Sequence, residues 1–522
     1  MTSISKFSRR HTLGLFGSVT AAAGSGAGAE VRADAGPIID VRSMYGAVGD
    51  GVHDDTDALQ TAIEDVSLGR RGGIIFLQAG TYRITKTLSF PVGAGGGIIC
   101  GSGCYVGDPR TKKRTGPYTV LVWDGETGGT MISAEGNLGW KISSISFVGN
   151  AVKGGARRAA VIYHCKWNKD FGSGEGFFER CWFVDAGAAI KMGQSRRDDG
   201  CADFVFVQIG FMFCDVGLYV SNLQGVNYNF LYLAASWCSS VIVAAEGGHF
   251  YIQNAQIVGC GDPTKDTWAF DFRNLNDNAS VVSINGLRVE QRTRAVLKAS
   301  GTGRVTIVGY EEAQINQLTT MLELSGVSAS ISHSRLVTHN PMRPHISLLQ
   351  GAQPSRFVGT DVFFDSESWE VPEWVGWTSN SSATVERSFY SNRGTGIPFW
   401  SNDPLIGPAV LSGQTEGGHE IELTVLGKAG LYIPRRGPSK ILSVQALVTN
   451  IATGEAITFE EKYVVSSEAA FKLAPEIASS REGRWGALDV RFSEDGARTR
   501  FFVKPSGKAI CSWRCVVVAQ GI

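Results

Sequence analysis

Short apolar strand endings recur along the middle of the chain, and their spacing constrains the fold more than any other feature of the sequence. Successive endings lie 23 to 29 residues apart. A unit of this length cannot bury its apolar face alone, so stacked units must share one core, which predicts a β-solenoid. Glycine, at 65 of 522 residues, agrees with many tight turns between strands. The equivalent strand endings begin at Ile190, Leu218, Val241, Phe270, Val296, Leu322 and Ile346.

A second strand in each unit can also be aligned. These strands start at Ile252, Ile284, Ile307, Ile331 and Phe357. Their fifth residues then fall in one outward column on neighbouring units. Strands lie ~4.8 Å apart, so opposite charges are expected to pair along this column. The column consists of Gln256, Arg288, Glu311, Arg335 and Asp361.

The residues before the repeat predict a short helix followed by strands. Asp54-Asp55-Thr56-Asp57 supplies side chains that favour the start of a helix. Apolar residues then recur at helical spacing, and Gly72-Gly73 ends the segment. The apolar positions are Ala58, Leu59, Ala62, Ile63 and Val66.

This segment resembles the N-terminus of the pectate-lyase-like superfamily of right-handed parallel β-helices. The resemblance implies that fold. It implies no particular chemistry, because hydrolases, lyases, epimerases and phage tailspikes of the superfamily share the segment. The residues that carry it are Tyr45-Gly46-Ala47-Val48-Gly49-Asp50-Gly51, Asp54-Asp55-Thr56, Gly72-Gly73 and Ala79-Gly80-Thr81-Tyr82.

These observations predict an all-β chain. A right-handed single-stranded parallel β-helix with a short N-terminal capping helix is expected over residues 36–400. A stretch rich in Gly, Pro and Ser at 401–418 is interpreted as a linker. The short strands that follow over 419–522 favour a small C-terminal antiparallel β-sandwich domain.

The first 35 residues are interpreted as an export signal. Arg9-Arg10 precedes an apolar run of small residues from Leu13 to Ala29, and Ala27-Gly28-Ala29 offers a cleavage site. This pattern resembles a bacterial twin-arginine signal peptide, although Thr12 stands where an aromatic residue is common. A basic tail without structure is the alternative. Export predicts a periplasmic or extracellular location.

The charge balance limits the partners. Lys+Arg and Asp+Glu both number 49, whereas a nucleic-acid binder needs a basic excess. No apolar window is long enough to predict a membrane span. The ten cysteines show no metal-binding spacing, and only Cys100 and Cys104 are placed to meet across a turn. We expect a polysaccharide partner and a monomer or homotrimer.

Three glutamates are the best candidates for catalysis. Glu290, Glu311 and Glu312 lie on adjacent expected units, and glycoside hydrolysis needs two carboxylates, one of them an acid. Ordinary ion pairs along an outward column are the competing interpretation. Asp185 and Asp215 form a second, weaker candidate pair.

A lyase has different requirements. It must neutralise the carboxylate of a uronic acid with a cation and remove an adjacent proton. No resident cofactor is predicted, although a divalent cation such as calcium would fit a lyase. Basic turns that suit an acidic polymer occur at Arg110-Thr111-Lys112-Lys113-Arg114, Arg157-Arg158 and Arg196-Arg197.

Aromatic and basic side chains predict the substrate contacts. Indole faces stack on the flat apolar surface of sugar rings. The predicted substrate-binding residues are Arg288, Arg294, Arg335, Trp237 and Trp268, and Trp369, Trp374 and Trp377 form a further group near the last unit.

The sequence therefore predicts an exported enzyme, a lyase or a glycoside hydrolase, that degrades an acidic or bacterial exopolysaccharide. The signature motifs of polygalacturonases and alginate epimerases are missing, which disfavours those two activities. The alternative is a non-catalytic glycan-binding or structural β-solenoid at the cell envelope.

Overall fold

The computed structural model describes residues 38–366, apart from several short segments, and the backbone of the strands beyond them. The segments left out are 72, 112–115, 151–158, 196–199, 223–226, 277–279, 291–292, 314–319, 339–344 and 350. The export signal expected at residues 1–35 lies outside the described residues and stays a prediction.

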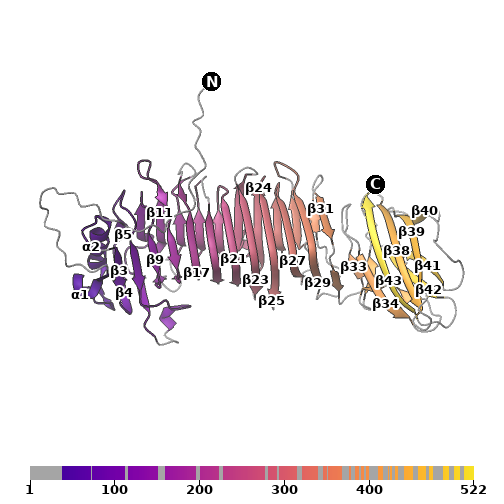
Figure 1. The fold of residues 1–522 in the computed structure, drawn as a ribbon, viewed down its shortest axis with the longest axis horizontal. Helices are drawn as coiled ribbons and strands as arrows, with labels where there is room; N and C mark the ends of the chain where they lie inside the picture. The colour runs from indigo at the N-terminus through magenta and orange to yellow at the C-terminus, as the bar shows by residue number, and fades with distance from the viewer. Residues whose placement is uncertain are drawn as a thin grey trace, which may run out of the picture.

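Parallel strands stack along the long axis of the molecule, which confirms the predicted parallel β-helix (Figure 1). In the central part, each turn of the β-helix combines one short strand and one long strand. The short strands are β15 (Ala188–Met192), β18 (Val216–Val220), β20 (Ser240–Ala244), β22 (Phe270–Leu275), β24 (Ala295–Gly301), β26 (Thr320–Ser325) and β28 (Ile346–Leu349). The long strands are β17 (Phe204–Met212), β19 (Tyr228–Ser236), β21 (His249–Val258), β23 (Val281–Glu290), β25 (Arg304–Ala313), β27 (Ser328–Thr338) and β29 (Arg356–Ser366).

The first turns use shorter pieces. On the short-strand side, β5 (Leu88–Phe90), β8 (Gly129–Glu135) and β11 (Ala159–Lys166) begin the eleven-stranded sheet, which ends at β30 (Val375–Trp377). The other pieces are β1 (Ile38–Asp40), β2 (Asp50–Asp54), β3 (Ile74–Leu77), β4 (Gly80–Ile84), β6 (Ile98–Gly101), β7 (Thr119–Trp123), β9 (Lys141–Ser143), β10 (Ser146–Val148), β12 (Ser173–Gly174), β13 (Phe177–Glu179), β14 (Trp182–Val184) and β16 (Cys201–Ala202).

One column of left-handed residues bends every long strand at the same place. Each of these residues has a φ between 50° and 75°, while pairing with the neighbouring strands continues on both sides. The bend divides the long-strand sheet into two faces, so three faces enclose the core. The column runs through Gln208, Tyr232, Asn254, Gly286, Gly309, His333 and Asp361.

Stacked aromatic rings fill the middle of the core. Phe206 lies between Phe178 and Phe230, with ring centroids 5.5 Å and 4.4 Å away and nearly parallel planes. Because parallel strands keep the same residue face at each level, one inward position can repeat the same ring in successive turns.

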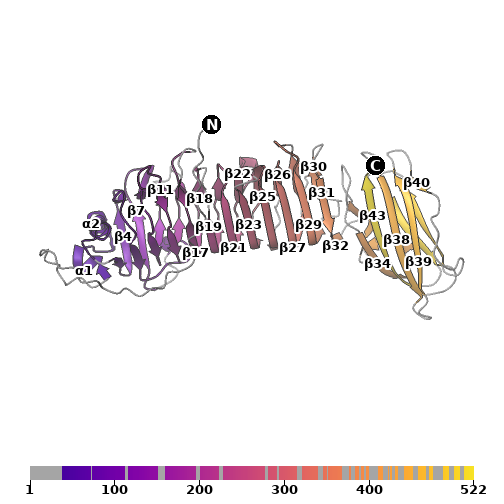
Figure 2. The same cartoon turned by 45° about the horizontal axis from the view of Figure 1, so that its top comes forward.

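Two helices lie at the N-terminal end, as Figures 1 and 2 show. The apolar face of α2 (Thr56–Ser67) buries Leu59, Ile63 and Val66, which confirms the predicted capping helix, and α1 (Val41–Tyr45) precedes it. Asp55 is fully buried and accepts hydrogen bonds from the backbone N–H groups of Val48 and Gly49, at 2.6 and 3.1 Å. The shared motif therefore maintains the fold at this end.

The pairing corrects three alignments made from the sequence. Leu218 lies opposite Ile242 rather than Val241, and Phe270 lies opposite Leu297 rather than Val296. Both valines are fully buried, so their burial did not distinguish the correct register from a shift by one residue.

The third correction concerns the last member of the outward column. Gln256, Arg288 and Glu311 are paired as expected, but Arg335 lies opposite Phe363. Asp361 instead lies in the column of left-handed residues, 3.6 Å from His333.

The C-terminal strands form sheets of their own. A five-stranded antiparallel sheet has the order β34 (Ala409–Thr415), β43 (Cys511–Gly521), β38 (Lys440–Asn450), β39 (Ala456–Val465) and β40 (Ala470–Leu473). A second antiparallel sheet contains β35 (Ile421–Glu422), β42 (Thr499–Pro505) and β41 (Gly486–Phe492). Strand β34 lies within residues 401–418, so this stretch contributes a sheet strand in addition to any linker.

The last strands of the solenoid are β31 (Ser382–Glu386) and β32 (Phe389–Asn392), and a small sheet contains β33 (Gly396–Pro398), β36 (Thr424–Val425) and β37 (Ala429–Tyr432). Cys100 and Cys104 are free thiols. Across the described residues, no helix is long and apolar enough to cross a membrane.

The ring stack generates the first prediction. Phe206→Ala should lower the free energy of unfolding by about 3–5 kcal/mol, because it removes a fully buried ring that contacts three others. Urea denaturation would measure the loss. Phe171→Ala is the matched control, since that phenylalanine is 52% exposed. Equal urea midpoints for the two variants would contradict the stacked core.

Candidate functional site

A second column of left-handed residues lies directly after the ends of successive strands. Asp185, Phe213, Trp237 and Gly259 come directly after β14, β17, β19 and β21, with φ between 55° and 64°. The N–H of Asp185 donates to Met212, that of Phe213 to Ser236 and that of Trp237 to Val258, at 2.8 to 3.1 Å. The hydrogen-bond ladder therefore holds these four positions on successive turns of the solenoid.

Trp237 offers an indole surface to solvent. Its side chain is 40% exposed, and the ring lies against Gly259 on the next turn. A Cβ at position 259 would come 2.6 Å from Cε3 of the indole, so only glycine leaves room for the ring. Gly259 also has a positive φ, which glycine adopts without strain.

Trp237 borders a surface pocket of about 290 Å³. The pocket brings together Trp237 and Arg294, two of the residues predicted from the sequence to bind substrate. It also contains Asp262 and Lys265, which the sequence analysis missed. The lining residues are Trp237, Cys238, Ser239, Gly259, Gly261, Asp262, Lys265, Thr267 and Arg294.

A compact loop places the charges of this pocket. Asp262 accepts hydrogen bonds from the backbone N–H and the hydroxyl of Thr264, at 3.0 and 2.7 Å, and thereby fixes the 3₁₀ turn Pro263–Lys265. Its other carboxylate oxygen lies 3.4 Å from Nη1 of Arg294. The signal for this loop was the Asp262-Pro263-Thr264 sequence, which favours a turn.

Asp262 is suited to remain ionised. The hydrogen bond from the Thr264 side chain lowers the pKa of the Asp262 carboxyl below its ordinary value. Asp262 is therefore a poor proton donor near neutral pH. Arg294 and Lys265 give the described lining two cations against this one carboxylate.

Cys238 lines the pocket from the core side. Its side chain is 2% exposed, and burial raises the pKa of its thiol well above the ordinary value. A thiol in that state is a poor nucleophile, so Cys238 acts as a small apolar residue.

The three predicted catalytic glutamates do not form one cluster. Glu290 accepts hydrogen bonds from Nε of Arg288 and Nε2 of Gln256, both at 2.8 Å. Glu311 is exposed and lies opposite Arg288 on the next strand. These contacts are those of an outward charge ladder, and the catalytic role predicted for Glu290 and Glu311 stays a prediction.

The catalytic role predicted for Glu312 is corrected, because its side chain points into the core. It is 5% exposed and accepts hydrogen bonds from the Tyr310 hydroxyl at 2.6 Å and the Val337 N–H at 2.6 Å, and Nε2 of His345 lies 3.1 Å away. Burial, together with the charge of Glu312, raises the pKa of Tyr310 well above its ordinary value. Glu312 therefore holds the interior together and has no access to a polymer.

Two predicted substrate-binding residues do not line this pocket. Trp268 is 3% exposed, and Nζ of Lys298 lies 5.9 Å from its ring centroid, so it has no free face for a sugar. Arg335 is exposed on β27, outside the residues that line the pocket.

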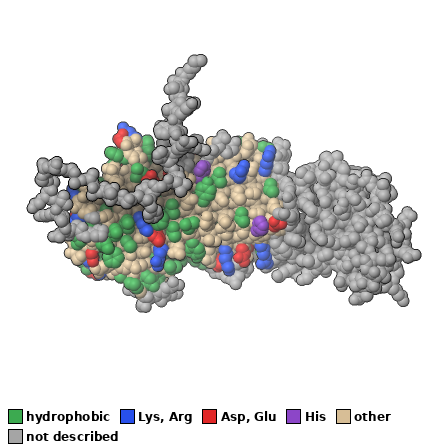
Figure 3. Space-filling model, viewed as in Figure 1, with side chains coloured by type: hydrophobic (Ala, Val, Ile, Leu, Met, Phe, Trp, Pro, Cys, Tyr) green, Lys and Arg blue, Asp and Glu red, His purple; other side chains and the backbone are tan. Residues whose placement is uncertain are grey.

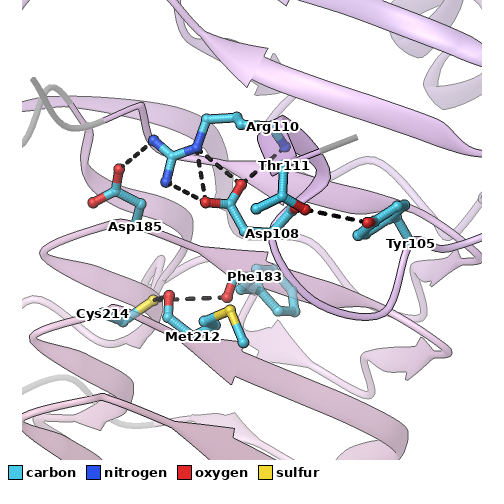
Figure 4. Close-up of polar contacts among 8 residues, drawn as sticks. All are labelled: Tyr105, Asp108, Arg110, Thr111, Phe183, Asp185, Met212 and Cys214. Atoms are coloured by element: carbon cyan, nitrogen blue, oxygen red, sulfur yellow. Dashed lines mark hydrogen bonds and ion pairs between the residues drawn. The ribbon is translucent and has the colours of Figure 1, made fainter. Parts of the chain in front are cut away.

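The second candidate pair lies on neighbouring turns, but its two side chains differ in burial. Asp185 is buried and binds Nη1 of Arg110 at 2.6 Å, while Asp108 binds the same guanidinium at 2.9 Å (Figure 4). Asp215 is exposed on the next turn, where its N–H donates to the carbonyl of Ala186, the residue after Asp185. Asp185 is the first residue of the second column. Its carboxylate and that of Asp108 thus hold the loop that carries Arg110 beside this column.

Other predicted groups lie outside the described residues. These are Lys112-Lys113-Arg114, Arg157-Arg158, Arg196-Arg197, Trp369 and Trp374, and Trp377 is described by its backbone alone. Among the described residues, no group of three or more His, Cys, Asp and Glu side chains is arranged to hold a metal ion. On the face shown in Figure 3, charged side chains are scattered rather than gathered in one field.

The N-terminal part of the chain matches a known family model. Residues 38–171 match the family model described as rhamnogalacturonase A/epimerase, pectate lyase-like, which supports the resemblance carried by the N-terminal motifs. Plasmin and fibronectin-binding protein A of Streptococcus pneumoniae is 50% identical over 42 residues, which are 8% of this chain and 6% of that protein.

Two solved structures are similar over most of the chain. One is tailspike protein gp49 of the Acinetobacter baumannii bacteriophage Fri1, a capsular polysaccharide depolymerase, with a TM-score of 0.34 and 10% identity over 93% of this chain and 86% of that one. The other is the catalytic domain of a GH87 alpha-1,3-glucanase in complex with nigerose, with a TM-score of 0.40 and 13% identity over 66% of this chain and 68% of that one.

The corrected role of Glu312 generates the second prediction. Glu312→Ala leaves the Tyr310 hydroxyl and the Val337 N–H buried without this acceptor, at about 1–3 kcal/mol for each group. Thermal unfolding should therefore occur at a clearly lower temperature. The exposed neighbour supplies the control, because Glu311→Ala should change stability by no more than about 0.5 kcal/mol. The assignment fails if the two variants are equally stable.

Proposed function

We propose that this protein binds an acidic polysaccharide in the Trp237 pocket and degrades it outside the cytoplasm. One observation carries the proposal: an exposed indole face, Arg294 and Lys265 border the same pocket. A sugar ring stacks on the indole through its apolar C–H surface. The two cations can then neutralise a carboxylate on that sugar or its neighbour.

The charges of the pocket favour elimination over hydrolysis. In an elimination, a base removes the proton next to the uronate carboxylate, the bond to the glycosidic oxygen breaks, and a carbon–carbon double bond forms. The leaving oxygen then takes up a proton. Arg294 and Lys265 would stabilise the negative charge that develops on the carboxylate. Hydrolysis needs two carboxylates, and Asp262 is the one carboxylate among the described residues of the lining.

Hydrolysis has a specific alternative location on the same molecule. Glu290 and Glu311 lie on adjacent strands of the outer face, although Glu290 forms an ion pair with Arg288 on its own strand and Glu311 lies opposite Arg288. If they act as acid and base, Glu290→Gln should abolish cleavage while Trp237→Ala leaves it intact. Among the described residues, no group of three or more His, Cys, Asp and Glu side chains fits a calcium ion, so the proposed elimination uses the two cationic side chains.

The third prediction tests binding and cleavage together. The mature chain would be incubated with a panel of uronate-containing and neutral polysaccharides, and Trp237→Ala and Arg294→Gln should each weaken binding by about tenfold or more. Tyr232→Ala and Arg304→Gln are matched controls, since both residues are exposed outside the pocket.

The products distinguish the outcomes. Ultraviolet absorbance of the new double bond identifies a lyase, and new reducing ends without that absorbance identify a hydrolase. Binding without either signal supports the non-catalytic glycan-binding alternative. If no polysaccharide binds, or if Trp237→Ala binds as well as the unchanged chain, the proposed function is wrong.

A further inference from the structure

Phe213 places a second exposed aromatic ring next to Trp237. Its side chain is 39% exposed, and it occupies the position of Trp237 one turn earlier in the solenoid. Both residues have a positive φ, of 55° and 58°. Neighbouring parallel strands lie ~4.8 Å apart, so the two side chains leave the surface one strand spacing apart along the long axis.

The fold demands the left-handed backbone at this column but not an aromatic side chain. Gly, Asn and Asp adopt this conformation most readily, and bulky residues rarely do. In the other left-handed column, the residues beside Tyr232 are Gln208 and Asn254. Aromatic residues on two successive turns of the Trp237 column therefore point to a use for the rings themselves.

The residues at the two ends of this aromatic pair indicate how an acidic oligosaccharide would be oriented on it. At one end lie Gly259 and the pocket with Arg294 and Lys265. At the other end lies Asp185, which is tied to Arg110 (Figure 4). Two cations therefore line the pocket end among the described residues, whereas Arg110 at the other end pairs with Asp108 and Asp185.

We propose that Phe213 forms a second sugar-binding subsite, so that an acidic oligosaccharide lies along the solenoid axis over Trp237 and Phe213. This inference rests on the proposed function. The acidic group occupies the pocket with Arg294 and Lys265, and a sugar farther along the chain stacks on Phe213. The affinity should therefore depend on chain length: a single uronic acid reaches Trp237 alone, and an oligosaccharide reaches both rings.

The fourth prediction uses this length dependence. Uronate ligands of two lengths, a single uronic acid and an oligosaccharide of about six sugars, would be prepared from the panel polymer that binds most tightly, and calorimetry would measure their binding. Phe213→Ala should weaken the binding of the oligosaccharide by about tenfold and leave that of the single uronic acid unchanged. Trp237→Ala should weaken both, and Phe213→Trp should retain the binding of the oligosaccharide.

The controls separate this inference from the proposed function. Tyr232→Ala removes an equally exposed aromatic residue with a positive φ and should change neither affinity. Thermal unfolding would show that each variant is folded. Normal binding of the oligosaccharide by Phe213→Ala, with weakened binding by Trp237→Ala, overturns the second subsite alone. Normal binding by both variants overturns the proposed function as well.

Discussion

The parallel hydrogen-bond ladder is the interaction on which every other feature of this solenoid depends. It continues through two columns of left-handed residues, so each long strand can bend at one corner and end at another without losing register with its neighbours. Because the same side of the backbone faces inward at every level, aromatic rings stack inside. The same regularity places Phe213 and Trp237 in line on the outer surface, after the buried Asp185.

The charges divide between structure and recognition according to their partners. Glu312 contacts Tyr310 and His345 in the core. Arg110 forms ion pairs with two aspartates, and Glu290 forms one with Arg288. These contacts stabilise the turns and the loop that crosses the outer face. Among the described residues that line the pocket, Lys265 and Arg294 accompany one carboxylate, that of Asp262. The pocket thus brings two cations beside an exposed indole.

The candidate site arises where a regular scaffold meets an irregular loop. The ladder supplies Trp237 and Gly259, and the turn fixed by Asp262 and Thr264 supplies Lys265. Turns tolerate changes of length because they lie outside the stacked core, so binding residues gather there. A rigid aromatic surface beside an adaptable charged loop is the division of labour expected for recognition of a polymer.

The sequence by itself determined the solenoid, because apolar alternation and a period of 23 to 29 residues admit few other folds. It also predicted Trp237 and Arg294 as substrate contacts, and the structure places both residues at one pocket. It did not determine the register at Val241 and Val296, because both neighbours in each pair are buried. Whether Glu312 points inward, and whether Asp262 and Lys265 join Trp237, was decided by the tertiary structure alone. Those relations depend on contacts between turns that are far apart in the sequence.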